Sequence, residues 1–309
     1  MLPLVSEVPE LLLYFEDEAN SAIGIATAAN MAVARVECHR FPDGELKLRL
    51  PERLPARAAV LRTLNQPNEK LLALLLVART AKTLGATHLT LVAPYLAYMR
   101  QDMAFHAGEA VSQRIVGGFL AELFDAVITV DPHLHRVATL HEAVPVPNAI
   151  VLSGAPLLAD LIAARHSNAL LVGPDEESAQ WIAQAAARHG FDFAVCHKTR
   201  HGDRSVDVVL PAVQTAGRAV VLLDDMASSG HTLANAARLL LAAGAASVDV
   251  AVTHALFAEG AVELIQAAGV SHIWSTDCVA HASNAVSMAP AIAAALASLH
   301  SATTRTIAP

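Results

Sequence analysis

Short, uninterrupted apolar runs alternate along this chain with longer Ala-rich stretches, and this alternation limits its fold more than any other feature. The apolar runs, rich in Val, Ile and Leu, occupy residues 89–93, 126–130, 169–172 and 219–223. Stretches with helical length and spacing occupy residues 69–84, 112–123, 178–189 and 232–243. Strands that are apolar on both faces are typical of a sheet that is covered by helices on both sides. The sequence therefore predicts an α/β fold with a parallel sheet.

Two segments resemble each other at a distance of about half the chain. LGATHLTLVAPYLAY at residues 84–98 and AGAASVDVAVTHALF at residues 243–257 each read as a helix end, a glycine and a strand. Their glycines, Gly85 and Gly244, lie 159 residues apart. This fits two similar halves, although any α/β protein repeats such a pattern. PVPN at residues 145–148 is a candidate seam, because proline disfavours helix and marks linkers.

The composition excludes several classes of protein. Of the 309 residues, 54% are hydrophobic and 16% are charged, which excludes a disordered chain. The net charge is −8 and no dense basic run is present, so no nucleic-acid partner is expected. The longest stretch without Asp, Glu, Lys or Arg is 278–304, but its apolar part, 286–299, is too short to span a membrane. We expect a buried C-terminal helix there and no membrane partner.

The cysteines and the N-terminus indicate a compartment. The three cysteines are isolated in the sequence and form neither a metal-binding spacing nor an even disulfide framework. The N-terminus carries Glu7 and Glu10 and has no basic region of the kind that begins a secretory signal. A reducing cytoplasm is therefore the expected location.

One segment, AVVLLDDMASSGHT at residues 219–232, combines an apolar strand, two carboxylates and a loop of small residues before a helix. The paired acids, the loop and the helix start are Asp224, Asp225, Ser228, Ser229, Gly230, His231 and Thr232. Small residues let backbone amides approach a ligand, and a helix N-terminus favours phosphate. Adjacent carboxylates accept hydrogen bonds from vicinal hydroxyls or hold a metal ion. The segment predicts a sugar-phosphate site at the carboxyl edge of the sheet.

A purely structural interpretation of this segment is an acidic strand end followed by a helix that Ser229 or Thr232 caps. The paired acids together with the run of small and hydroxyl residues favour ligand binding over that interpretation. The segment is not a Walker A loop, because it has no Gly-Lys-Ser/Thr.

The loop at residues 224–232 resembles the phosphoribosyl-diphosphate-binding loop of the phosphoribosyltransferase fold. Further motifs extend the resemblance over nearly the whole chain, in register, to the ribose-phosphate diphosphokinase family. These motifs are FPDGE at 41–45, PNEKLLALL at 67–75, PYLAYMRQD at 94–102, VDPH at 130–133, GPD at 173–175, KTR at 198–200 and VSMAP at 286–290. The resemblance implies two similar phosphoribosyltransferase-like domains, residues 1–148 and 149–309, each a mainly parallel sheet flanked by helices. The last helix, about residues 286–300, is a candidate for packing back on the first domain.

The resemblance implies an ATP-dependent transfer of a diphosphoryl group to the anomeric hydroxyl of ribose 5-phosphate, giving phosphoribosyl diphosphate and AMP. The implied ATP-binding residues are Phe41, Asp43, Gly44, Glu45, Arg100 and Gln101. Phe41 would stack on adenine. In this family the segment at 41–45 serves a neighbouring subunit, which implies a homo-oligomer. Judged locally, Asp43 and Gly44 form a hairpin turn, and Arg100 is equally well a solvated cation after a strand.

The resemblance also implies Mg²⁺ as a cofactor, with His133 and Asp175 as its ligands. Lys198 and Arg200 would lie on a mobile catalytic loop, close over the polyphosphate and stabilise charge in the transition state. Arg200 would also contact the ribose phosphate. The structural alternatives are a lone histidine without a ligand role for His133 and solvated loop cations for Lys198 and Arg200.

Three positions depart from the family's pattern. Ser228 stands where Asp is common, His231 stands where Gly is common, and Met103 stands where a basic residue is common. Two other functions therefore remain open: a phosphoribosyltransferase that shares the loop, and a non-catalytic homologue that regulates a synthase. The expected ATP-binding residues argue against the first, and the expected metal-binding and catalytic residues argue against the second.

Overall fold

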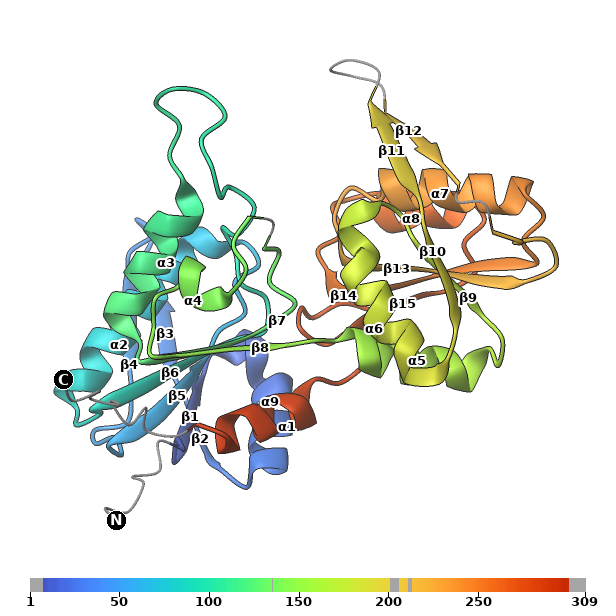
Figure 1. Cartoon of the computed structure of the whole chain (residues 1–309). Helices are drawn as coiled ribbons and strands as arrows, with labels where there is room; N and C mark the ends of the chain where they lie inside the picture. The colour runs from blue at the N-terminus through green and yellow to red at the C-terminus, as the bar shows by residue number, and fades with distance from the viewer. Residues whose placement is uncertain (1–7, 135, 201–205, 211–212, 300–309) are drawn as a thin grey trace, which may run out of the picture. The chain divides into compact units, whose positions relative to one another are not determined.

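The chain folds into two compact units in the computed structural model, which describes residues 8–134, 136–200, 206–210 and 213–299 (Figure 1). The first unit runs to Leu152 and includes the chain again from Ala289, and the second unit is Ser153–Met288. Within these residues, each unit contains one six-stranded parallel sheet and one two-stranded antiparallel hairpin. The predicted α/β fold with parallel sheets is confirmed.

The first sheet has the strand order β2-β1-β5-β6-β7-β8. Its strands are β1 (Leu11–Tyr14), β2 (Ala32–Arg35), β5 (Arg57–Leu61), β6 (His88–Ala93), β7 (Ala126–Val130) and β8 (Asn148–Leu152). The hairpin strands are β3 (Glu37–Arg40) and β4 (Leu46–Arg49). The helical elements are η1 (Glu16–Glu18), α1 (Ala19–Ala29), α2 (Pro67–Thr83), α3 (Ser112–Leu123), α4 (Leu140–Ala143) and α9 (Ala289–Ala297).

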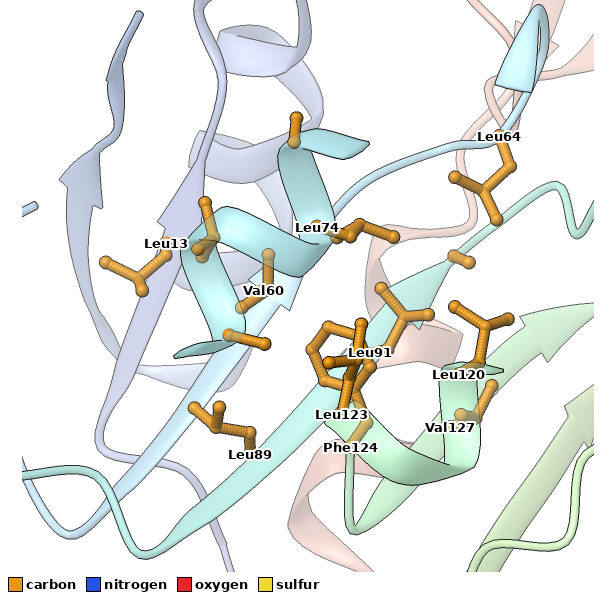
Figure 2. Packing of buried hydrophobic residues seen from close by; sticks show 14 of the residues in the cluster. Leu13, Val60, Leu64, Leu74, Leu89, Leu91, Leu120, Leu123, Phe124 and Val127 are labelled. Carbon is orange, nitrogen blue, oxygen red and sulfur yellow. The ribbon is translucent and has the colours of Figure 1, made fainter. Parts of the chain in front are cut away.

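The core of the first unit lies between its sheet and helices α2 and α3 (Figure 2). Leu13, Val60 and Leu91 from the strands meet Leu74 of α2 and Leu120 of α3, and all five are fully buried. Each buried side chain of this size contributes about 1.5–3 kcal/mol relative to leaving it exposed. The apolar runs at 89–93 and 126–130 of the sequence thus form strands β6 and β7, which contribute to this core.

The second sheet has the strand order β10-β9-β13-β14-β15-β16. Its strands are β9 (Leu170–Gly173), β10 (Asp192–Val195), β13 (Ala219–Ala227), β14 (Ser247–Ala255), β15 (Ile273–Thr276) and β16 (Asn284–Val286). The hairpin strands are β11 (His197–Arg200) and β12 (Val206–Val209). The helical elements are α5 (Ala155–Arg165), η2 (Glu176–Ser178), α6 (Ala179–His189), α7 (His231–Ala242) and α8 (Ala261–Ala267).

The two units repeat one topology. Strand by strand, the first sheet order corresponds to the second, and a hairpin follows the edge strand in both. The register agrees as well: Leu11 of β1 pairs with Ala58 of β5, and Leu170 of β9 pairs with Val220 of β13. The similar segments at residues 84–98 and 243–257 contain β6 and β14, which hold the same place in their sheets. The expectation of two similar halves is confirmed.

The division between the units differs from the expected boundary of 148/149. Residues 148–152 form β8 and pair with β7, from Ala126↔Asn148 onwards, so the first unit continues to Leu152. PVPN at 145–148 leads into this last strand rather than separating the two sheets. Helix α9, drawn in red in Figure 1, belongs to the first unit and packs against α1.

The Ala-rich C-terminal helix, Ala289–Ala297, is shorter than the expected range of about 286–300, and residue 286 belongs to β16 instead. Across the described residues, no helix has both the length and the apolar character that crossing a membrane requires.

Candidate active site

The two predicted acids, Asp224 and Asp225, lie within a strand rather than after it. β13 continues to Ala227 because its neighbour β14 is equally long, and the pairing extends through Asp224↔Val252 to Ala227↔Ala255. The expected strand end at residue 223 is therefore four residues early. Asp225 is 2% exposed, and its amide donates a hydrogen bond to Asp224 Oδ1 at 3.0 Å. The acid pair is thus fixed by the sheet.

Three carboxylates lie near enough to this strand end for their charges to interact. Burial raises the pKa of Asp224 well above its usual value, and the charges of Asp225 and Asp175 raise it further. Asp175 follows β9, which pairs directly with β13, and its Oδ1 accepts a hydrogen bond from the Glu177 amide at 3.1 Å. Because like charges are crowded in a buried place, the cluster favours a cation or hydroxyl donors as a ligand.

The charge of Asp175 also reaches the neighbouring strand. Cys196 follows β10 and is fully buried, and its amide donates to the Gly173 carbonyl. Burial, and secondly the charge of Asp175, raise the pKa of the Cys196 thiol to about 11. Cys196 is therefore an inert thiol beside the acid cluster.

The loop of small residues connects β13 to α7 and is fixed by backbone hydrogen bonds. The Leu256 amide donates to the Ala227 carbonyl at 3.0 Å, and the Ala258 amide donates to the Ser228 carbonyl at 3.1 Å. Ser228 and Ser229 are exposed, and no side-chain hydrogen bond caps α7 in the described part of the chain. The first amides of this helix have no intrahelical acceptor, which suits an anion.

Gly230 has a conformation that its place in the loop requires. Its φ is +77°, and an added Cβ would lie 3.0 Å from the Ala261 carbonyl oxygen and 3.1 Å from the Ile265 side chain. His231 instead begins the helix and is not among the residues with positive φ. The histidine at position 231 therefore imposes no backbone strain.

The first unit has a counterpart of this strand end, and its own side chains fill it. Counted from the equivalent register pairs, Arg62 and Thr63 occupy the positions of Asp224 and Asp225. Arg62 Nη1 binds Asp17 at 2.7 Å and Glu18 at 3.2 Å, and its guanidinium lies 4.2 Å from the centre of the Phe15 ring.

The connection to the following helix is also shorter in the first unit. Four residues, 63–66, separate Arg62 from α2, whereas six residues, 225–230, separate Asp224 from α7. Lys70 Nζ donates to the Thr63 carbonyl at 2.9 Å and to Asn65 Oδ1 at 2.6 Å. The lysine side chain thus occupies the shorter loop. Of the two equivalent strand ends, the one in the second unit is therefore the better candidate for a ligand.

Replacing Glu18 with glutamine is expected to weaken the dependence of stability on pH. Burial raises the pKa of Glu18 from 4.5 to about 7, against the opposing effects of the Thr63 amide and Arg62. The folded state therefore binds more protons than the unfolded state between these values. Wild-type stability then falls as pH rises through this window, by on the order of 3 kcal/mol at most, and levels off above it.

Urea unfolding of the wild type and of Glu18→Gln across this pH range measures the effect. Glu16→Gln is the matched control, because Glu16 is 73% exposed in its ion pair with Arg35. The control should keep the wild-type slope and Glu18→Gln should lose most of it. Equal slopes in all three proteins would contradict the assignment.

The expected nucleotide segment at 41–45 is the turn between β3 and β4, as its Asp-Gly pair predicts. The Phe41 amide donates to the Glu45 carbonyl at 2.8 Å, the Gly44 amide donates to the Phe41 carbonyl at 2.9 Å, and the Glu45 amide donates to Asp43 Oδ1 at 3.2 Å. Phe41 is 39% exposed, and its ring contacts His39 edge to face at 4.9 Å. The turn therefore presents an aromatic face and carboxylates at the surface.

The other expected nucleotide residues lie at the carboxyl edge of the first sheet. Arg100 and Gln101 follow β6, and His133 follows β7, which pairs with β6 in parallel. The Gln113 amide, at the start of α3, donates to the Gln101 carbonyl at 3.1 Å. Arg100 is exposed, and His133 is partly buried. The two loops therefore meet at one edge.

Lys198 and Arg200 lie on β11, where Lys198 pairs with Val208 and Arg200 pairs with Val206 of β12. The stretch expected to be a catalytic loop is thus partly an antiparallel hairpin. The rest of it, residues 201–204, lies outside the described residues.

The two expected metal ligands lie in different units, His133 in the first and Asp175 in the second. Within the described ranges, no three His, Cys, Asp or Glu side chains are arranged to hold a metal ion. Within the second unit, the charge of Asp175 instead acts on Asp224.

One arginine at the edge of the first sheet, Arg136, was not predicted from the sequence motifs. Arg136 follows His133 by three residues and forms an ion pair with Asp102 at 2.6 Å. The sequence shows that Asp102 and Arg136 each follow a predicted strand. It does not show that the two side chains pair, because that contact depends on the tertiary structure.

Comparison with known proteins agrees with this arrangement. The family described as the N-terminal domain of ribose phosphate pyrophosphokinase matches residues 11–123, and the phosphoribosyl transferase domain family matches residues 148–273. The ribose-phosphate pyrophosphokinase of Methanopyrus kandleri is 34% identical over 279 residues, 89% of this chain and 94% of that protein. Ribose-phosphate pyrophosphokinase 2 of Archaeoglobus fulgidus is 33% identical over 269 residues, 87% of this chain and 93% of its own.

A solved structure shares the whole architecture. The crystal structure of phosphoribosylpyrophosphate synthetase from Mycobacterium smegmatis aligns with a TM-score of 0.80 and 25% identity, over 93% of this chain and 97% of that one. With the repeated topology, the acid pair of β13 and relatives at this level of identity, the chain belongs to the ribose-phosphate pyrophosphokinase family.

Proposed function

We propose that this protein transfers the β,γ-diphosphoryl group of ATP to the anomeric hydroxyl of ribose 5-phosphate and releases AMP. The observation that carries the proposal is the acid pair of β13 beside the start of α7, which no side chain caps among the described residues. Asp224 and Asp225 would accept hydrogen bonds from the ribose hydroxyls. The amides of residues 228–232 would hold the 5-phosphate. One ligand with a diol and a phosphate satisfies both groups.

Nucleotide binding is assigned to the carboxyl edge of the first sheet. Arg100 and Gln101 would contact ATP, because a guanidinium suits phosphate oxygens and Gln101 is held at the start of α3. The turn at 41–45 would serve the ATP of a neighbouring subunit, with Phe41 stacking on adenine and Asp43 and Glu45 accepting hydrogen bonds. This assignment makes the functional protein a homo-oligomer.

Mg²⁺ is the proposed metal, with His133 and Asp175 each proposed as a ligand, and when bound it would neutralise charge on the polyphosphate. Lys198 and Arg200 would bind the transferred group as charge develops, with Arg200 also contacting the ribose phosphate. The protein needs no covalent nucleophile, because phosphoryl transfer depends mainly on positioning and charge neutralisation.

The proposed location is a reducing cytoplasm, in line with the free thiols of Cys38, Cys196 and Cys278. Neither a nucleic acid nor a membrane is a proposed partner, in line with the net charge of −8.

Incubation with ATP, Mg²⁺ and ribose 5-phosphate tests the proposal, with AMP as the measured product. AMP formation that requires all three additions is the expected result. AMP at background level with saturating substrates would overturn the synthase assignment and favour a regulatory homologue. Consumption of phosphoribosyl diphosphate with a purine or pyrimidine base, without ATP, would favour a phosphoribosyltransferase.

Replacing Asp224 with asparagine is expected to move ligand affinity and stability in opposite directions. Affinity for ribose 5-phosphate should fall about tenfold or more, because one of the two carboxyl oxygens that accept from the ribose hydroxyls is replaced by an amide nitrogen, which cannot accept. Stability at neutral pH should rise, because the raised pKa of Asp224 means that its ionised form is disfavoured in the folded state.

Calorimetric titration with ribose 5-phosphate and urea unfolding measure the two effects. Asp192→Asn is the control, because Asp192 is 69% exposed and pairs with Arg218 elsewhere in the same unit. The control should bind like the wild type. An unchanged affinity in Asp224→Asn would place the sugar-phosphate site elsewhere.

A further inference from the structure

A buried carboxylate joins the two loops at the carboxyl edge of the first sheet. The Asp102 side chain is completely buried, its Oδ1 accepts from Arg136 Nη1 at 2.6 Å, and its Oδ2 accepts from the Arg136 amide at 3.2 Å. Asp102 lies in the loop after β6, and Arg136 lies in the loop after β7. Since β6 and β7 are adjacent and parallel, this pair fixes the loops that carry Arg100, Gln101 and His133.

The pair is asymmetric, because its carboxylate is buried while its guanidinium is not. The Arg136 side chain is 53% exposed, and it also lies over the Phe105 ring at 5.7 Å. Removing a carboxylate from water has a desolvation cost, and an ion pair with a half-exposed cation returns little stability. The arrangement does hold a guanidinium in one orientation at the surface, which is what recognition of an anion requires.

The surroundings of Arg136 point to the kind of anion. Arg100 and Gln101, which are assigned to ATP, directly precede Asp102 in the sequence. Asp102 in turn holds the Arg136 side chain, so all three belong to or contact the same loop. Gln113 strengthens this loop from α3, where its Nε2 donates to the Met99 carbonyl at 3.1 Å and its side chain is buried. Arg136 is therefore held by a residue of the same loop that carries Arg100, at the edge assigned to nucleotide.

We propose that Arg136 binds the phosphate chain of the nucleotide and that Asp102 is the positioning residue that holds it. This inference rests on the proposed function, because it deepens the assignment of the same edge to ATP. With Nη1 engaged by Asp102, the remaining N–H groups of the guanidinium donate to phosphate oxygens. Asp102 contacts no ligand in this assignment and acts through Arg136.

Direct binding measurements test the proposal without requiring turnover. Calorimetric titrations use α,β-methylene-ATP, inorganic tripolyphosphate, adenosine and ribose 5-phosphate as separate probes. Arg136→Gln is expected to weaken binding of the ATP analogue and of tripolyphosphate about tenfold, and to leave adenosine and ribose 5-phosphate within about twofold. A structural role alone would not separate the phosphate probes from adenosine.

Arg35→Gln is the matched control. Arg35 is 54% exposed and pairs with Glu16 at 2.6 Å in the same unit, so this pair has the same length but a solvated carboxylate. The control should bind every probe like the wild type. Asp102→Asn should weaken the phosphate probes as well, and the double variant with Arg136→Gln should be no weaker than Arg136→Gln alone, because both changes remove one contact.

The outcomes separate this inference from the proposed function. Phosphate-probe affinities within about twofold of wild type in Arg136→Gln would overturn the inference, as would an equal loss for adenosine. Wild-type protein that binds the analogue but forms no AMP would overturn the proposed reaction, while the Arg136→Gln comparison would still decide the contact. Wild-type protein that binds neither phosphate probe would overturn both.

Discussion

Replacing Lys198 with alanine is expected to lower the turnover number about 10³-fold while the Kd for ribose 5-phosphate stays within about twofold. A cation that binds the transferred diphosphoryl group acts in the transition state more than in the ground state, so its loss reduces kcat rather than substrate affinity. A 10³-fold loss corresponds to about 4 kcal/mol of transition-state stabilisation. Steady-state AMP formation and calorimetric titration with ribose 5-phosphate measure the two quantities.

Two further variants make this result specific. Lys82→Ala removes an exposed lysine from the last turn of α2 and should leave both quantities unchanged. Lys198→Arg keeps the charge but changes its shape, so it should recover part of the turnover. Equal losses of turnover and ribose 5-phosphate affinity in Lys198→Ala would contradict the assignment of Lys198 to the transferred group.

Replacing Gly117 with alanine is expected to destabilise the protein by about 3–5 kcal/mol, a value typical of severe overpacking at a rigid contact. Gly117 lies on the buried face of α3, where α3 meets α4. An added Cβ would lie 1.7 Å from the Ala143 carbonyl oxygen and 2.8 Å from the Ala143 carbonyl carbon. Because the obstructing atoms are backbone, rotation of a side chain cannot relieve the overlap.

The next residue supplies the control. Gly118 belongs to the same helix, and an added Cβ there has no neighbour within 4 Å. Gly118→Ala should therefore raise the unfolding free energy by about 0.5–1 kcal/mol through helix propensity and reduced chain entropy. Urea unfolding of both variants measures the difference, and a similar change in both would contradict the close contact between α3 and α4.

Sequence patterns located the elements whose causes are local. The helix expected at 112–123 and the strand expected at 126–130 match α3 and β7, because a helical apolar period and a continuous apolar run are properties of the segments themselves. The turn at 43–44 likewise follows from an Asp-Gly pair. The strand end expected at 223 was wrong, because the length of β13 depends on its pairing with β14.

The candidate site divides in the same way. The acids and small residues of 224–232 indicated a sugar-phosphate site, since carboxylates, hydroxyls and backbone amides have their chemistry wherever they lie. That Asp175 raises the pKa of Asp224 depends on the pairing of β9 with β13. Arg62 forms ion pairs with Asp17 and Glu18, which fill the equivalent strand end of the first unit. These partners precede Arg62 in the sequence by 45 and 44 positions.

Periodicity and residue types within single segments determined the fold class and the chemical character of the candidate site, and the two similar halves were implied by the order of the motifs that resemble one family. Only the tertiary structure decided which of two adjacent glycines lies against a carbonyl, and which arginine a buried carboxylate holds at the surface. Such contacts depend on the packing of distant segments, and neither the composition nor the spacing of one segment contains that information.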